Sequence, residues 1–244
     1  MLLGLVPCIA FAANFGVGPM MVELGNAAKT GLVKISNVDA SPLQLQVRLF
    51  SWTLGAQGES LYEESDDLVF YPHLLEIQPK EERLIRAGIK QPAMDKEKSY
   101  MLFIEEIPQS QKKTLENEPL AASAKGMKVA VAVRFGVPVF VLPVKPEFNA
   151  EVSHIALDKG VLALTVRNTG NAHLVIPEIQ LKSEGEFTKS VVGGTVLSGS
   201  ARDYRIPIPD NVCNTLGQLD IIVKTRTEKL EPKAVFKIDK ALCR

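Results

Sequence analysis

The chain has no excess of charge of either sign, and only a few histidines and cysteines. Its 244 residues contain 28 Lys and Arg against 28 Asp and Glu, so the net charge is near zero. Balanced charge gives no general electrostatic reason to bind nucleic acid or an anionic membrane. The histidines His73, His154 and His173 stand apart, without HxxH or HxH spacing. We expect surface or hydrogen-bonded structural roles for them, and no metal site.

Motifs of enzymes are also missing. The sequence has no G-x-S-x-G, no Walker loop and no GxGxxG after a strand. The adjacent carboxylates Asp66-Asp67 and Glu81-Glu82 would point to opposite faces of a strand, so we expect solvated turn residues. The single tryptophan, Trp52, argues against a platform of stacked aromatics for carbohydrate and is expected in the core or at a strand end. We predict that the protein is not an enzyme and needs no cofactor.

The apolar run at the N-terminus, MLLGLVPCIAFAA, is too short to span a bilayer. Its small residues predict a secretory signal peptide over residues 1–12, cleaved after Ala12, and no membrane insertion. No Lys or Arg precedes the run, so the true start could lie upstream or the signal could be a weak one. A buried N-terminal strand is the alternative. Lipid attachment at Cys8 is not expected, because Pro7 stands where a small residue is needed.

Cysteine is scarce: the chain has three, and Cys8 would leave with the signal peptide. Cys213 and Cys243 then form an even pair in an oxidising compartment, which predicts a disulfide that ties the C-terminal tail to the second half. Two free buried thiols are the alternative. A CxxC spacing, typical of redox or metal sites, is absent.

No stretch has helical periodicity longer than two turns. Short strands with turn signals recur instead at roughly ten-residue spacing, which predicts an all-β fold of two β-sandwiches. We place the first domain at residues 13–144 and the second at 145–244, with a hinge at Leu142–Pro146. The expected strands include Met20–Leu24, Gly31–Ile35, Pro42–Phe50, Asp66–Tyr71, Leu74–Ile77, Arg83–Ala87, Ser99–Ile104, Val161–Val166, Tyr204–Ile208, Leu219–Val223 and Ala234–Ile238.

The stretch Met127–Val141 alternates at period two over an unusual length. One face carries an apolar set, and the other face carries small residues, a lysine and Arg134. The apolar set is Met127, Val129, Val131, Val133, Phe135 and Val137. Such a strand is either the centre of a sandwich core or a hydrophobic edge offered to another chain, which is an aggregation hazard unless it is managed. The polar segment before it, Gln109–Gly126, is predicted to be a long mobile loop.

Arg134 lies in the middle of this apolar strand, where an isolated cation is costly unless it is paired or faces a cleft. One interpretation places it on the solvent face of the strand. The other places it in a cleft between the domains, where it could bind an anionic group such as a chain-terminal carboxylate. Arg86 is a second candidate, and could equally be a surface strand residue.

Several motifs of the first half follow one another in a set order. They are VKISN from Val33, Ser51-Trp52 before a glycine turn, Tyr71-Pro72, IQP from Ile77 with Arg86 beyond it, LFIEEIP from Leu102, and RFGVP from Arg134. Their order and spacing resemble the N-terminal domain of the periplasmic pilus chaperones of the chaperone–usher pathway, the PapD-like family. The second half is similar through its short strands and VRNTGN from Val166. The VPVFV ending looks more like the archaic branch of that family.

The resemblance implies two immunoglobulin-like domains set at an angle and a periplasmic location. It also implies that the last strand of the first domain donates apolar residues to an incomplete pilin-like subunit. Carried over residue by residue, the inserted set is Met127, Val129, Val131 and Val133. The long loop before them is then expected to become ordered when a subunit docks.

Two cations of the family anchor the C-terminal carboxylate of the subunit. Arg134 lies within one residue of the first of these, a cleft lysine. The second, an arginine in the first strand, has no counterpart, because the matching position is Met21. The resemblance therefore implies either different anchoring or replacement by another cation, such as Arg86. The family's arginine just before the strand-ending proline is also absent, since Val137 stands there.

The leading hypothesis is a periplasmic, ATP-independent chaperone that stabilises pilin-like subunits by donor-strand complementation and delivers them to an outer-membrane usher. Neither nucleic acid nor membrane insertion is expected. Self-association through the donor strand of the unliganded chain is left open. The alternative is a secreted two-domain structural or adhesive pilus subunit that pairs with itself through the same strand.

Overall fold

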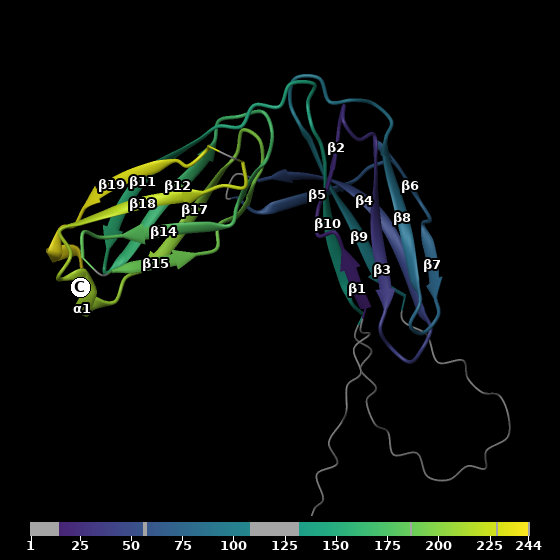
Figure 1. Cartoon of the computed structure of the whole chain (residues 1–244), viewed down its shortest axis with the longest axis horizontal. Helices are drawn as coiled ribbons and strands as arrows, with labels where there is room; N and C mark the ends of the chain where they lie inside the picture. The colour runs from purple at the N-terminus through teal and green to yellow at the C-terminus, as the bar shows by residue number, and fades with distance from the viewer. Residues whose placement is uncertain (1–14, 56–57, 108–131, 186, 228, 244) are drawn as a thin grey trace, which may run out of the picture.

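The computed structural model describes residues 15–55, 58–107, 132–185, 187–227 and 229–243. Two β-sandwiches meet at one end and are set at an angle to each other (Figure 1). This confirms the predicted all-β fold of two immunoglobulin-like domains. Helical structure in the described residues is limited to α1 (Asp210–Cys213) and the 3-10 turn η1 (Lys240–Cys243).

The first sandwich contains β1 to β10. Their bounds are β1 Phe15–Gly18, β2 Val22–Leu24, β3 Thr30–Asn37, β4 Leu43–Leu54, β5 Ser60–Glu64, β6 Leu68–Tyr71, β7 Leu74–Ile77, β8 Glu82–Ile89, β9 Lys98–Glu106 and β10 Arg134–Val141. One sheet has the order β1-β3-β8-β6, and the other has the order β2-β10-β9-β4-β5, with β7 also paired to β4. The chain crosses between the two sheets early, because β1 pairs with β3 and β2 pairs with β10.

Alternation of apolar and polar residues positions these strands. In β4, Leu43, Leu45 and Val47 are buried, while Gln44 and Gln46 are exposed. Because successive side chains of a strand point to opposite faces, this pattern turns one face of each sheet inward. The inward faces of both sheets together form one hydrophobic core.

The second sandwich contains β11 to β19. Their bounds are β11 Ala150–Asp158, β12 Val161–Asn168, β13 Leu174–Ile176, β14 Glu178–Lys182, β15 Thr188–Val191, β16 Gly194–Val196, β17 Ala201–Pro207, β18 Gln218–Lys224 and β19 Lys233–Lys237. Its strand groups are β11-β12-β17, β13-β16 and β15-β14-β18-β19, and they enclose a second core. The hairpin between β11 and β12 turns through Lys159 and Gly160, both at positive φ (48° and 70°), as a two-residue hairpin loop requires.

In each sandwich, one strand ends at a buried asparagine with the same pattern of hydrogen bonds. The Asn37 side-chain amide donates to the carbonyls of Ser41 and Ile77, both at 2.9 Å, and its Oδ1 accepts from the Asp39 amide. The Asn168 side-chain amide likewise donates to the carbonyls of Ala172 and Val196, and its Oδ1 accepts from the Gly170 amide. The two halves therefore share a turn whose buried polar groups are all satisfied.

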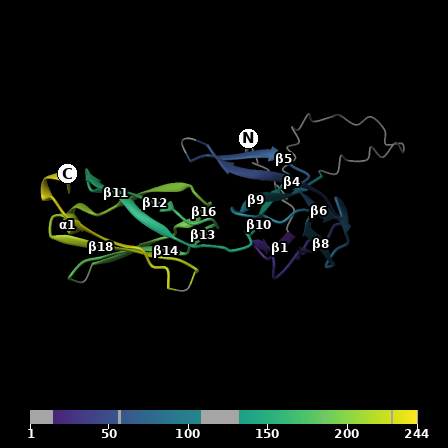
Figure 2. The ribbon, with the colours of Figure 1, turned by 90° about the horizontal axis from the view of Figure 1, so that it is seen from above.

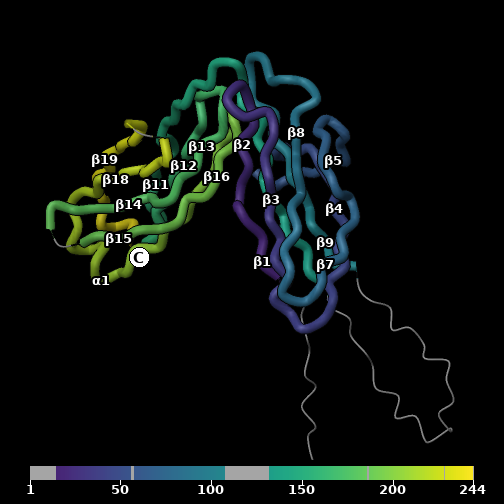
Figure 3. The backbone as a smooth tube through the Cα atoms, turned by 45° about the vertical axis from the view of Figure 1, so that its right-hand side comes forward, coloured from purple at the N-terminus to yellow at the C-terminus, as the bar shows by residue number. Residues whose placement is uncertain are grey.

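The two sandwiches are joined by backbone as well as by side chains. The Asn171 side-chain amide donates to the carbonyls of Asp95 (2.9 Å) and Lys145 (3.0 Å), and the Glu97 amide donates to the Asn171 carbonyl (2.9 Å). Figure 3 shows β2 of the first sandwich beside β13 and β16 of the second. A cleft of about 410 Å³ remains between the domains, lined by residues 51–54 and 96–100 on one side and 197, 198 and 200 on the other, with Asp67.

The structure departs from the sequence expectations in several places. β4 runs on through Trp52 to Leu54, so Trp52 lies within a strand and contributes to an aromatic surface outside the core rather than ending the strand. β5 was not expected, because all its side chains are exposed and give no apolar alternation. The alternating stretch Met127–Val141 is described only from residue 132, and strand β10 begins at Arg134. The predicted signal peptide and the loop Gln109–Gly126 lie outside the described residues.

Candidate functional site

The free edge of β10 lies in the second half of the alternating stretch Met127–Val141. On one side, β10 pairs with β9 along its whole length, from Arg134 opposite Glu105 to Val141 opposite Lys98. On the other side, β2 pairs only with residues 139–141. Within the described part of the chain, residues 134–138 therefore have a strand neighbour on one side only.

The direction of the backbone groups along this edge follows from the ladder. The Glu106 amide donates to the Val133 carbonyl (2.9 Å), so the odd-numbered residues of β10 bond toward β9. The even-numbered residues bond toward the opposite side, and the Leu142 amide does so by donating to the Leu24 carbonyl (2.8 Å). The amides of Arg134 and Gly136 therefore point out of the sheet along the free edge. Pro138 has no amide and ends this row of donors.

The side chains of β10 divide between the core and the outer face of the sheet. Val137, Val139 and Val141 are buried in the first core, and Phe135 packs against it. Of the two possibilities that the periodicity left open, the second half of the alternating stretch is therefore a core strand. Arg134 lies on the outer face, and Phe140 on the same face contacts the second sandwich through His173. This face of the sheet is thus turned toward the second domain.

Arg134 is neither isolated nor buried. Its Nε lies 2.7 Å from Glu105 Oε1, and its guanidinium carbon lies 3.5 Å from the centre of the Phe103 ring. Half of its side chain is exposed (49%). The ion pair and the cation–π contact hold the guanidinium against the outer face of the sheet, over Phe103.

Aromatic rings cover the same outer face. Phe103 lies 5.4 Å from Phe50 and 5.2 Å from Tyr62 between ring centres, both edge to face, and Tyr62 lies 6.4 Å from Trp52. Gly136 lies beneath this layer: a Cβ there would come within 2.9 Å of Met101 Sδ and 3.1 Å of Phe103 Cε1. An apolar surface on the outside of a sandwich is typical of a protein-binding face. Figure 2 shows the β4–β5 hairpin of this face reaching toward the second domain.

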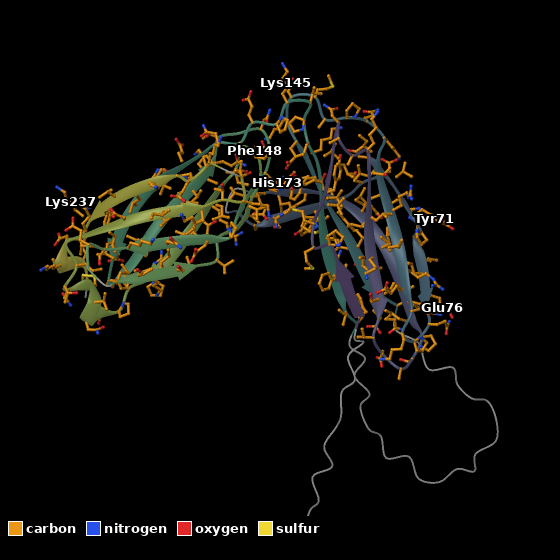
Figure 4. The ribbon with its side chains drawn as sticks, in the orientation of Figure 1. Tyr71, Glu76, Lys145, Phe148, His173 and Lys237 are labelled. Carbon is orange, nitrogen blue, oxygen red and sulfur yellow. A yellow bond between two sulfur atoms is a disulfide. The ribbon has the colours of Figure 1, made fainter. Side chains whose placement is uncertain are left out.

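The structure places the predicted site residues in different parts of the molecule. Val133 is half-buried and joins the β9 ladder, whereas Met127, Val129 and Val131 lie outside the described residues. Arg86 is exposed on β8, in the other sheet, beside Tyr71. Figure 4 shows Tyr71 on the side of the first sandwich turned away from the second. Because Arg86 and Arg134 lie on opposite outer faces, the geometry does not support Arg86 as a replacement cation in the cleft.

The disulfide joins Cys213 at the end of α1 to Cys243 in η1, with 5.7 Å between the Cα atoms. Both cysteines are fully buried in the second core. This is the pairing that the cysteine count predicts.

His173 has one of the expected structural roles, buried and hydrogen-bonded, but with partners that its sequence neighbours do not indicate. It is buried at the joint between the domains, with Nδ1 2.7 Å from Glu97 Oε2 and Nε2 3.5 Å from Glu23 Oε1. Burial lowers the pKa of His173, but hydrogen bonds to Glu23 and Glu97 and the charges of both carboxylates outweigh it and raise the pKa to about 9. The pKa of Glu23 is lowered, chiefly by its hydrogen bond to His173 and against its own burial. No spacing in the sequence joins residues 23, 97 and 173, so only the fold could reveal the cluster.

Within the described residues, no group of three or more His, Cys, Asp or Glu side chains is placed to hold a metal ion. No helix among them is long and apolar enough to cross a membrane.

Two β-sandwiches joined at an angle define a two-domain immunoglobulin-like protein. The model of the family described as pili and flagellar-assembly chaperones, PapD N-terminal domain, matches residues 14–147, more than half of the chain. The chain therefore belongs to the family of PapD-like pilus chaperones. A search of curated proteins finds no match.

Solved structures of chaperones share the fold over nearly the whole chain. The complex of the SafB chaperone with SafA pilin from Salmonella enterica matches with a TM-score of 0.60 and 15% identity, covering 93% of this chain and 99% of that one. The complex of CsuC with the tip adhesion subunit CsuE, from archaic Csu pili of Acinetobacter baumannii, matches with a TM-score of 0.58 and 18% identity, covering 90% and 98%. The E. coli chaperone DraB matches with a TM-score of 0.55 and 16% identity, covering 91% and 98%. At these identities, the likeness shows a common fold.

Proposed function

We propose that this chaperone binds pilin-like subunits in the periplasm by β-strand addition at the edge of β10 and delivers them to an outer-membrane usher. The observation that supports this most is the edge of residues 134–138, which has a strand neighbour on one side only among the described residues. In the sequence, this edge follows directly on the alternating residues Met127–Val133. In strand addition, backbone hydrogen bonds supply the affinity and alternate side chains fill the pockets of the partner.

The chemistry of the edge fits a partner that is itself an incomplete sheet. Unpaired amides and carbonyls beside apolar side chains favour pairing with another strand. Between Val133 and Pro138, the two outward amides belong to Arg134 and Gly136, so the described edge offers a short ladder. Met127, Val129, Val131 and Val133 would extend it and fill the hydrophobic groove of the subunit.

The relatives support the choice of partner. SafB is in complex with a pilin, and CsuC is in complex with a tip adhesion subunit of archaic pili. We carry this partner class over to the present chain and place it in the archaic branch. The same proposal includes a signal peptide at residues 1–12, a subunit-binding domain at residues 13–144 and a second domain at residues 145–244. Family membership does not favour the alternative of a structural or adhesive subunit.

The test replaces two predicted donor residues with carboxylates. In Val129→Asp/Val131→Asp, charges would have to enter the apolar groove of the subunit, so the tagged chaperone should no longer recover the pilin-like subunit that copurifies with the wild type. The periplasmic level of that subunit should fall with it. Circular dichroism would check that the variant stays folded.

A matched control uses the other face of the same stretch. Ala130→Asp/Ala132→Asp adds the same two carboxylates one residue along, where strand alternation turns them away from the groove. It should retain at least half of the wild-type recovery. If Val129→Asp/Val131→Asp recovered as much of the subunit as the wild type does, strand donation would be contradicted. Polymers of the purified chain without any partner would support the alternative function.

A further inference from the structure

The joint between the domains contains a buried ionic cluster that the proposed function does not use. His173 precedes β13 in the second sandwich, and its side chain is 3% exposed. Glu97 precedes β9 and Glu23 lies in β2, both in the first sandwich; Glu97 is fully buried and Glu23 is 45% exposed. Figure 4 shows His173 at the point where the two sandwiches meet. His173 of the second sandwich therefore contacts two carboxylates of the first sandwich across the domain boundary.

Each group of the cluster has a defined partner. Glu97 Oε2 accepts from the His173 backbone amide (2.9 Å) and faces His173 Nδ1 (2.7 Å), while its Oε1 accepts from the Ser99 hydroxyl (3.2 Å). The imidazole lies flat on the Phe140 ring, with 3.7 Å between ring centres and an angle of 10° between the planes. The first domain therefore contacts both nitrogens and one face of the ring.

The geometry also selects a protonation state. Both ring nitrogens face carboxylate oxygens, at 2.7 and 3.5 Å, and only the imidazolium has a proton to donate on each nitrogen. A neutral ring would turn a lone pair toward one carboxylate and leave the buried Glu97 without a counter-charge. An unpaired buried carboxylate is strongly disfavoured.

Three basic residues lie near the cluster in space or in the chain. Arg226, which follows β18 in the second domain, lowers the pKa of Glu23 by its charge. Lys96 and Lys98, the chain neighbours of Glu97, line the cleft between the domains. Among the groups with charge or hydrogen-bond effects on His173 itself, Glu23 and Glu97 both favour its charged form.

We propose that His173 is a positioning residue whose protonated ring holds the two domains at a fixed angle, and that the angle becomes variable when the ring loses its proton. This concerns the free chain and does not depend on subunit binding. The angle decides how the free edge of β10 and the second domain face a common partner, so proton release would alter the binding cleft without touching the edge itself.

The pH window follows from the direction of the shifts. His173 has a folded-state pKa of about 9, above its usual 6.5, so its contribution is complete below pH 6.5 and is lost as the pH rises through 9. The pKa of Glu23 is lowered, so its contribution is present above pH 4.5 and is lost as the pH falls through the lowered pKa. The joint is therefore expected to be tightest from about pH 5 to about pH 6.5 and to loosen on the alkaline side through His173.

The test measures the distance between the domains directly. Spin labels are placed at Val69→Cys in β6 and Val192→Cys after β15, both well exposed (56% and 84%), in a Cys8→Ser background. Double electron–electron resonance should give one narrow distance distribution at pH 6 and a distribution at least twice as wide at pH 10. His173→Gln should give the same width at both values. A control without the other imidazoles, His73→Gln/His154→Gln, should behave as the wild type.

A second variant keeps the test decisive if His173→Gln does not fold. Glu97→Gln leaves the imidazole in place but removes its closest counter-charge, so the pH of half-loosening should fall by at least one unit. Nuclear magnetic resonance of the His173 ring should follow the same midpoint. Equal distance distributions at pH 6 and pH 10 in the wild type would overturn the proposal, as would a pH response that persists in His173→Gln or an unshifted midpoint in Glu97→Gln.

Discussion

Arg134 lies where the free edge of β10 meets the aromatic face of its sheet. Its guanidinium is paired with Glu105 and stacked on Phe103, which explains how a cation is accommodated beside an apolar strand. The structure shows the solvent-face position of the first interpretation; binding of an anionic group in the cleft between the domains stays a prediction. The face is exposed, and it is also the face turned toward the second domain.

At this scale we predict that Arg134→Ala weakens subunit binding about tenfold, equivalent to about 1.4 kcal/mol, because a partner at the edge loses a charged contact. Arg134→Lys should fall in between, since lysine keeps the charge but not the planar stack. Titration of purified subunit by calorimetry would measure both. Arg48→Ala is the matched control, because Arg48 lies 5.0 Å from the Phe50 ring centre and pairs with Glu64, on β4 away from the edge. If Arg134→Ala bound the subunit as tightly as Arg48→Ala and the wild type do, Arg134 would have no role in binding.

At the scale of elements, strands with one buried face could be predicted from the sequence. β4 and β10 alternate between apolar and other residues because one face of each packs on the core. β5 could not be predicted in this way, because its five residues are exposed and its place is set by pairing with β4. The extension of β4 through Trp52 has the same origin: β5 supplies the partner for residues 50–54.

The disulfide between α1 and η1 gives a prediction for the second domain. It closes a segment with a sequence separation of 30, so Cys213→Ala/Cys243→Ala should lower the free energy of unfolding of that domain by about 2–5 kcal/mol. Urea unfolding followed by circular dichroism would report the loss. Trp52, the single tryptophan, lies in the first domain, so its fluorescence transition should move much less. Reducing agent should shift the wild type and leave the variant unchanged; no shift in either would mean that the bond contributes nothing to stability.

At the scale of the whole molecule, the motif order predicted the two-domain architecture and the family, but not the joint. Glu23, Glu97 and His173 come from three distant parts of the chain, and nothing in their local sequence marks them as partners. Asn171 is similar: it ends the VRNTGN motif, but its hydrogen bonds to Asp95 and Lys145 depend on how the sandwiches meet. Side chains that join domains are selected by tertiary geometry, which local periodicity does not encode.

The central claim is that a partner strand completes the sheet at the edge of β10, and amide hydrogen exchange tests it most directly. In the free chain, the amides of Phe135 and Val137 should exchange slowly because they bond toward β9, while those of Arg134 and Gly136 should exchange fast. Saturation with the pilin-like subunit should slow Arg134 and Gly136 at least tenfold and leave Phe135 and Val137 nearly unchanged. If Arg134 and Gly136 exchanged equally fast in the saturated complex, the subunit would bind elsewhere and strand addition at this edge would be wrong.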